Sequence, residues 1–241
     1  KKEEKKKGGN LMPTNYENIP MYLKENARFC CWKYDDTNGR KTKIPYSPHT
    51  GRKAKTNNPN TFCDFNTAIN ASGYEGIGIR VDGRIVGIDL DHCIEGGELS
   101  TWAKEITNYF NDTYIEVSPS GTGIRIFCLM PDNLNYNTKT YYIKKGNIEV
   151  YIPGYTNRFL TITGNAVTNV NVTETEDALC WLLDTYMKRP TLSVTVDIPG
   201  ESYLNDDTVI LKASTAVNGD KFKKLWNGDI TEYGSRSEAD A

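Results

Sequence analysis

The sequence predicts an α+β protein in which helices pack on a mixed or antiparallel β-sheet. Segments with the period-two pattern of strands alternate irregularly with segments of helical spacing. Several strand segments also follow one another across short turns rich in glycine, which is typical of antiparallel neighbours. A regular alternation of strands and helices would instead indicate a parallel sheet. The chain has 241 residues, which suits one large domain with a small appendage.

The N-terminal part is predicted to hold an unstructured segment, a strand pair and a helix. Residues 1–12 begin KKEEKKKGGN, which indicates a disordered lead-in, or alternatively a basic arm that touches DNA. The segments 28–34 (RFCCWKY) and 43–47 (KIPYS) are expected to be strands on either side of the turn DDTNGRK. Segment 57–72 begins with a turn and continues with apolar residues at helical spacing.

The central part is predicted to hold a hairpin and then a helix. The strand segments 76–81 (GIGIRV) and 84–90 (RIVGIDL) are separated by Asp82-Gly83, a common hairpin turn. A helix is expected from about residue 99 to 110, with Ser100 as a possible cap.

More strands and one more helix complete the main domain, which we expect to span residues 13–189. Segments 114–118 and 124–130 are expected to be strands on either side of the turn PSGTG. Three further strands, TYYIKK, IEVYI and RFLTITG, end near Gly164. The apolar spacing from 174 to 187 indicates a helix.

The character of the chain changes after Arg189-Pro190. Residues 190–205 have the composition of a linker, and short helical stretches follow near 206–215 and 219–226. The final SEAD has the pattern of a helix start with Ser237 as its cap. We therefore expect 206–241 to be the start of a helical domain that continues in a longer protein.

Charge and cysteine usage exclude several classes of protein. The net charge is −2, so contact with nucleic acid would need local basic patches. The six cysteines have no paired C-x-x-C spacing, and only His49 and His92 are available beside them. This favours buried free thiols in a reducing cytosol over disulfides or a zinc site. No apolar run approaches the ~20 residues of a membrane span, so no membrane partner is expected.

An acidic pair ends one predicted strand. In a strand, residues i and i+2 point to the same face, so Asp89 and Asp91 project together. Two close carboxylates repel each other, and one tends to hold a proton unless a cation lies between them. Mg²⁺ accepts carboxylate oxygens and keeps waters that a phosphate substrate can replace. The alternative is a strand end that turns into solvent, where acidic pairs are common.

Glu149 lies among β-branched and aromatic residues in IEVYI. An acid within a buried strand needs a partner, and it could be a third ligand for the same cation. Alternatively, Glu149 lies on the solvent face of its strand. The alternation of residue types does not decide between the two.

A glycine-rich turn and two arginines could hold an anion. In SPSGTGIRIF (118–127), glycines beside Ser and Thr would let backbone amides approach a phosphate. Arg125 follows with a planar donor fork, and Arg158 lies in NRFLTITG. Such loops are more often simple hairpin turns, so the loop indicates an anion site only in combination with the carboxylates and the arginines. Three carboxylates, two arginines and such a loop match the needs of metal-dependent nucleotidyl transfer.

The order DLD, SPSGTGIRI, EVY and RFLTITG resembles the primase-polymerase domain of the archaeo-eukaryotic primase superfamily, in the branch found in phage and mobile-element replication proteins. The segments WKYDDTNGRKTKIPYSPHTGRKA, NNPNTFCDFNTAI and KLWNGDITEYGSRSEADA resemble the same branch, so that the similarity spans residues 25–241. It implies an RRM-like sheet joined to an N-terminal α/β module. It also implies a C-terminal helical region, usually followed by a helicase.

The resemblance implies roles for individual residues. Asp89, Asp91 and Glu149 match the acidic residues that bind two Mg²⁺ or Mn²⁺ ions and carry catalysis. The positions implied in nucleotide binding are Ser120, Gly121, Gly123, Arg125, Arg158 and Lys43. Lys43 could equally be a solvated hairpin lysine.

One site position departs from the family pattern. Arg125 stands where the family has a histidine that contacts the phosphates of the nucleotide. An arginine can hold phosphate but does not titrate near neutral pH. His92 is a poor substitute, because it points to the opposite face of the strand from the acids.

Three hypotheses follow. The first is a primase-polymerase that joins nucleoside triphosphates on a single-stranded DNA template, in the cytoplasm of a bacterium or a phage-infected cell. The second is a degenerate domain that binds DNA or assists assembly beside a helicase. The third is an RRM-like sheet that binds RNA by stacking bases on Tyr114, Phe127 and Tyr151.

Overall fold

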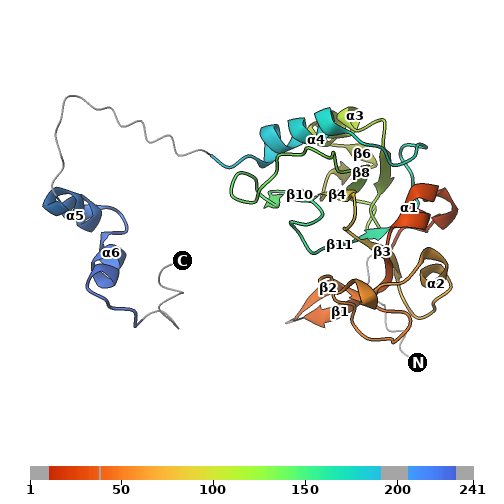
Figure 1. The fold of residues 1–241 in the computed structure, drawn as a ribbon, viewed down its shortest axis with the longest axis horizontal. Coiled ribbons are helices and arrows are strands. Elements are labelled where there is room, and N and C mark those ends of the chain that lie inside the picture. The colour runs from red at the N-terminus through yellow and green to blue at the C-terminus, as the bar shows by residue number, and fades with distance from the viewer. Residues whose placement is uncertain (1–10, 38, 191–205, 232–241) are drawn as a thin grey trace. The chain divides into compact units, whose positions relative to one another are not determined.

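The computed structural model describes residues 11–37, 39–190 and 206–231 and divides the chain into two units, Lys1–Pro190 and Thr191–Ala241. The larger unit contains antiparallel sheets and helices (Figure 1), which confirms the predicted α+β class. Most of the predicted lead-in, nearly all of the linker and the Ser237 cap lie outside the described residues.

A four-stranded antiparallel sheet is formed mainly by the N-terminal part of the larger unit. Its order is β11 (Phe159–Ile162), β3 (Gly76–Arg80), β1 (Phe29–Thr37) and β2 (Arg40–Tyr46). Strands β1 and β2 pair as a hairpin, as predicted, and both extend further toward the turn than the sequence pattern indicated.

A five-stranded antiparallel sheet carries the acidic residues. Its order is β7 (Tyr114–Val117), β8 (Ile124–Leu129), β4 (Ile85–Leu90), β10 (Ile148–Tyr151) and β9 (Lys144–Lys145). Of the predicted strand TYYIKK, only the last two residues belong to a strand. A small hairpin of β5 (Ile94–Glu95) and β6 (Glu98–Leu99) follows β4.

The predicted hairpin across Asp82-Gly83 is wrong, because β3 and β4 belong to different sheets. Both edges of β3 are already paired, one with β1 and the other with β11. The amide of Ile85 donates to the carbonyl of Asp82, and this turn carries the chain from one sheet to the next. The two strand patterns were correct, but a short turn between strands does not require that they pair.

One face of the five-stranded sheet is covered by helices. These are α3 (Thr101–Tyr109) and α4 (Glu176–Leu182), the latter continuing as a π-helical turn over Leu183–Met187 (Figure 1). Val86, Ile88 and Leu90 of β4 belong to the buried cluster that also contains Ile106 and Leu179 of these helices. Ser100 occupies the position before α3 as predicted, but its side chain makes no cap hydrogen bond.

The opposite face packs against the four-stranded sheet. Ile85 and Phe127 from one sheet share a buried cluster with Ile79 and Leu160 from the other. A Cβ atom added at Gly87 would lie 2.5 Å from Cδ1 of Leu160, so the two sheets approach closely here and the leucine side chain would have to move. The remaining helical elements are η1 (Tyr16–Asn18), α1 (Met21–Asn26), η2 (Pro59–Thr61) and α2 (Phe65–Ile69).

This packing contradicts the hypothesis that the sheet binds RNA by stacking. The relative exposures of Tyr114, Phe127 and Tyr151 are 1%, 0% and 6%. All three belong to the cluster between the two sheets, so they offer no face on which a base could stack.

The second unit contains two short helices at the predicted positions, α5 (Asp206–Thr215) and α6 (Gly219–Trp226). The rings of Phe222 and Trp226 stack within α6, with centroids 5.6 Å apart.

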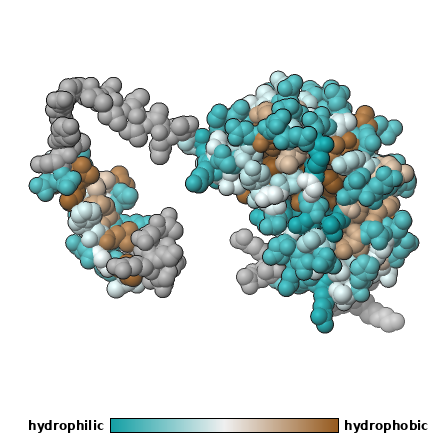
Figure 2. All heavy atoms as spheres, in the orientation of Figure 1, coloured by the Kyte–Doolittle hydropathy of each residue, from teal (hydrophilic) through white to brown (hydrophobic). Residues whose placement is uncertain are grey.

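The face of the larger unit that Figure 2 shows is mostly hydrophilic, with hydrophobic residues in smaller groups. Among the described residues, no helix is long and apolar enough to cross a membrane.

Candidate active site

A row of charged side chains crosses the five-stranded sheet. Arg125 on β8 lies opposite Glu116 on β7 and opposite Asp89 on β4. Asp89 in turn lies opposite Glu149 on β10, and Glu149 lies opposite Lys144 on β9. Directly opposed residues of neighbouring strands share a face. The row therefore lies on the face that looks toward the four-stranded sheet.

The three predicted metal ligands line one cavity at the polar end of this face. The cavity has a volume of about 410 Å³, and Asp89, Asp91 and Glu149 lie in its wall together with Arg125 and Lys43. The other lining residues come mostly from β1, β2 and β11: Tyr34, Lys41, Thr42, Tyr151, Phe159, Leu160 and Thr161. Acids from two separate segments of the sequence thus meet at one place.

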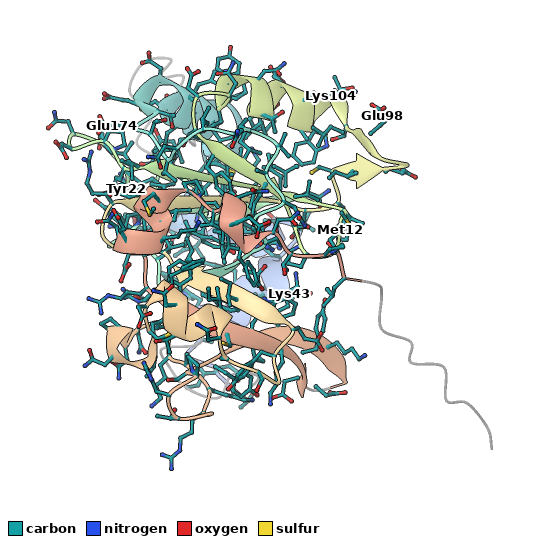
Figure 3. The ribbon with its side chains drawn as sticks, turned by 90° about the vertical axis from the view of Figure 1, so that its right-hand side faces the viewer. Met12, Tyr22, Lys43, Glu98, Lys104 and Glu174 are labelled. Atoms are coloured by element: carbon teal, nitrogen blue, oxygen red, sulfur yellow. The ribbon has the colours of Figure 1, made fainter. Side chains whose placement is uncertain are left out.

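Lys43 reaches this cavity from β2 and is half-buried. Its ammonium group lies 5.6 Å from the centre of the Trp32 ring. Burial and then the charge of Arg125 lower the pKa of Lys43 to about 8, while Asp89 and Asp91 oppose both effects. In Figure 3 its label lies between the layer of the four-stranded sheet and the layer above it. Lys43 is therefore a residue of the cavity wall rather than a fully solvated hairpin lysine.

Asp89 is largely desolvated by its position between the sheets. Burial raises the pKa of this carboxyl, and Asp91 and Glu149 raise it further, while Arg125 and Lys43 oppose the shift. Oδ1 of Asp89 lies 3.3 Å from Nε of Arg125. Both atoms are buried without a hydrogen bond, so the pair is an ion pair that lacks hydrogen-bond geometry.

Arg125 is buried, with 4% of the residue exposed. Nη1 donates to the carbonyl oxygen of Thr161 over 2.8 Å and also to Oγ1 of the same residue. Since Thr161 lies on β11, the guanidinium group links the two sheets while it faces Asp89. Arg125 thus contacts the protein itself through both Nη1 and Nε.

Both carboxylate oxygens of Glu149 have partners within the protein. The ammonium group of Lys144 donates to Oε1, and the hydroxyl of Tyr151 donates to Oε2. Burial of Tyr151 and this hydrogen bond raise the pKa of the tyrosine hydroxyl. A cation that bound Glu149 would use a remaining lone pair of these oxygens or replace one of the two donors.

The donor chemistry of the site fits a hard divalent cation. Carboxylate oxygens are the ligands that Mg²⁺ and Mn²⁺ prefer, and Oδ1 of Asp89 is a buried oxygen without a hydrogen-bond donor. As the side chains lie in the described part of the chain, no group of three or more His, Cys, Asp or Glu residues is arranged to hold a metal ion. Binding would thus require these side chains to move toward a common point.

The glycine turn is held by its own hydrogen bonds. The amide of Gly121 donates to the carbonyl oxygen of Ser118, and the amide of Gly123 donates to the hydroxyl of Ser118. The hydroxyl of Ser120 lies between those of Ser118 and Thr122. Ser120, Gly121 and Gly123 are absent from the wall of the acidic cavity. The structure therefore does not bring the turn into that cavity.

Arg158 lines a second cavity of about 840 Å³, which shares Lys43, Glu149 and part of β2 with the first. The guanidinium carbon of Arg158 lies 6.0 Å from the centre of the Tyr151 ring. Lys53 and Lys55 also line this cavity, so the larger cavity is basic. In the smaller one, the three acids are matched by Lys41, Lys43 and Arg125.

Glu116, which lies in the row beside Arg125, was not predicted from the sequence. It accepts hydrogen bonds from the amides of Thr163 and Gly164 and from the hydroxyl of Tyr114. Burial raises its pKa to about 7, although Arg125 and these hydrogen bonds oppose the shift. An acid within the strand YIEVS could have been identified by the argument applied to Glu149.

Lys144 and Thr161 were also missed, because their roles depend on pairing that the sequence does not reveal. His92 is exposed in the turn after β4, with a φ of 49°. It is absent from the wall of the acidic cavity, as expected.

Comparison with known proteins identifies a relative, while no family model matches the chain. The chain is 32% identical over 151 residues to a protein of Nitratiruptor phage NrS-1 named "DNA Primase-polymerase". The match covers 59% of this chain and 20% of the phage protein, so the chain spans about one fifth of the relative's length. The resemblance indicated by the motifs is therefore confirmed: over these residues the chain is homologous to a phage DNA primase-polymerase.

Proposed function

We propose that this chain is the primase-polymerase domain of a phage or mobile-element replication protein. It would join nucleoside triphosphates on a single-stranded DNA template in a reaction that requires Mg²⁺ or Mn²⁺. The observation that carries the proposal is the meeting of Asp89, Asp91 and Glu149 in the wall of one cavity. The homology to a phage primase-polymerase supports the same function.

The topology supports a primase-like arrangement of residues 13–189. On the five-stranded sheet, the chain order is β4, α3, β7, β8 and β10, which begins as the split βαβ pattern of RRM-like sheets does. The helix expected between the third and fourth strands instead follows β11. The four-stranded sheet corresponds in this proposal to the N-terminal module.

The site residues divide into two roles. Asp89, Asp91 and Glu149 would hold divalent cations, which supply charge stabilisation for the attacking hydroxyl and for the leaving pyrophosphate. Lys43 lines both cavities and Arg158 lines the larger one, and they would bind the triphosphate. Arg125 would fix the orientation of Asp89 through its ion pair, besides facing the phosphates.

The proposal is tested by incorporation of labelled nucleotides on single-stranded DNA with Mg²⁺ or Mn²⁺. We expect products in the wild type and none in Asp89→Asn or Asp91→Asn. A product that persists in both variants would refute the site assignment. Supply of either ribo- or deoxynucleoside triphosphates in separate reactions covers both substrate classes.

A second candidate function is that of a degenerate domain that binds DNA beside a helicase. It is favoured by Arg125, which is bonded to Thr161 and paired with Asp89 instead of projecting freely. Binding of single-stranded DNA without incorporation under any metal would support this function. Gain of incorporation in Arg125→His would then identify the arginine as the cause of the loss. The helicase and the cytoplasmic location stay predictions from the resemblance.

A further inference from the structure

Lys144 faces Glu149 because of the hairpin that joins β9 to β10. The hairpin turns at Gly146, which has a φ of 59°, as tight hairpin turns require. This turn fixes the register so that Lys144 lies opposite Glu149, while Lys145 lies opposite Ile148. Neighbouring residues of a strand point to opposite faces. Of the two lysines, Lys144 alone lies on the face that carries the acids.

The ammonium group of Lys144 is paired with the carboxylate of Glu149. It donates a hydrogen bond to Oε1, while the Tyr151 hydroxyl donates to Oε2. The side chain of Lys144 is 59% exposed, whereas that of Glu149 is 16% exposed. The lysine can therefore move into solvent with little loss of packing, and the glutamate stays in the cavity wall.

We propose that Lys144 is a resident counter-cation of Glu149 and competes with a divalent metal ion for this carboxylate. The inference rests on the proposed function, since it takes Asp89, Asp91 and Glu149 as the metal site. Without metal, the ammonium group offsets the repulsion between Glu149 and Asp89, which lie directly opposite each other. When metal binds, Lys144 leaves Glu149. An exposed ion pair of this kind should weaken metal binding by about two- to fivefold.

The test is a titration of the full chain with Mn²⁺ in the absence of nucleotide and DNA, followed by calorimetry or by the EPR signal of free Mn²⁺. We expect Lys144→Gln to bind Mn²⁺ about two- to fivefold more tightly than the wild type. Lys145→Gln is the matched control, since it removes the same charge from the same hairpin on the opposite face. Lys144→Arg keeps a cation beside Glu149 and should retain the wild-type affinity.

The outcomes separate this inference from the proposed function. Equal Mn²⁺ affinity in Lys144→Gln and Lys145→Gln, or weaker binding in Lys144→Gln, would overturn the competition while leaving the metal site intact. If the wild type binds no more Mn²⁺ than the double variant Asp89→Asn, Asp91→Asn, the metal site itself is wrong and the inference fails with it. Thermal unfolding of each variant establishes that the affinities refer to folded protein.

Discussion

Asp89 on β4 and Glu149 on β10 lie directly opposite each other on neighbouring antiparallel strands. Like charges in this relationship destabilise a sheet unless other groups compensate them. Here Arg125 faces Asp89 on one side, and Lys144 faces Glu149 on the other. The protein thus holds two adjacent carboxylates in place by flanking them with two cations.

Removal of either carboxylate should abolish nucleotide incorporation. Asp89→Asn and Glu149→Gln keep the size of each side chain but remove a negatively charged ligand. Loss of a residue that only supports a metal ligand lowers activity by up to about 100-fold, so we expect loss of the ligand itself to lower the rate of incorporation by at least that much. The measurement is primer synthesis on single-stranded DNA. Glu98→Gln is the control, since Glu98 forms a surface pair with Lys104 at the periphery of the unit (Figure 3) and should leave the rate unchanged. Wild-type rates in Glu149→Gln would contradict the assignment.

Arg125 should contribute more to stability than any exposed arginine of the chain. Arg125→Ala leaves Asp89 buried without its counter-charge and removes the link to Thr161. Breaking a buried pair from one side costs about 3–5 kcal/mol of unfolding free energy. Arg125→Lys keeps the charge without the planar fork, so its unfolding free energy should lie between those of the wild type and Arg125→Ala. Urea unfolding measures these values, with Arg158→Ala, an exposed site, expected to stay within about 0.5 kcal/mol of the wild type. If Arg125→Ala lowers the unfolding free energy as little as Arg158→Ala does, Arg125 has no such stabilising role.

Glu116 should make the protein less stable as the pH rises. Burial raises its pKa to about 7 from an ordinary value of 4.5, so the folded state binds the proton more tightly than the unfolded state. The stabilisation is complete below about pH 4.5 and is lost as the pH rises through 7, and the loss amounts to about 3 kcal/mol. Glu116→Gln removes the ionisable group while keeping an oxygen that can accept from the amides of Thr163 and Gly164.

The measurement for Glu116 is urea unfolding of the wild type and of Glu116→Gln at pH values from 5 to 8. The difference in unfolding free energy between the two proteins should change by about 2.5 kcal/mol over this range, in favour of the variant at high pH. Comparison at each pH cancels the contributions of groups that both proteins share. Parallel curves would show that Glu116 does not titrate in this range.

The sequence predicted local structure well because its apolar periodicity is local. The pattern around Asp89 and Asp91 placed both acids at the end of a buried strand, where β4 ends at Leu90. The pattern did not reveal which strands pair, and so the hairpin across Asp82-Gly83 was expected where the chain changes sheets. For the same reason, the residues left open whether Glu149 lies beside Asp89 or on the solvent face, because no local pattern specifies which residues lie opposite each other. The family resemblance favoured the first alternative.

Burial by a second sheet accounts for the other differences. Tyr114 and Phe127 are aromatic residues on strands, and a single sheet would have exposed them on its open face. The four-stranded sheet covers that face and places them in the core. Arg125 is affected in the same way: its donor fork was expected to bind phosphate, whereas β11 lies close enough for Thr161 to accept its hydrogen bonds.

The glycine turn should prove necessary for stability even without any ligand. A Cβ atom at Gly123 would lie 2.7 Å from the carbonyl oxygen of Leu90, which is backbone and cannot rotate away. Gly123→Ala should therefore push β8 from the end of β4 and lower the unfolding free energy by about 1–3 kcal/mol, the usual cost of overpacking. Ser120→Ala, at an exposed position of the same turn, is the control and should cost less than about 0.5 kcal/mol. Urea unfolding without metal or nucleotide measures both. If Gly123→Ala unfolds like the wild type yet loses nucleotide binding, the glycine serves the ligand rather than the strand pairing, and the anion-binding role expected from the sequence would regain its support.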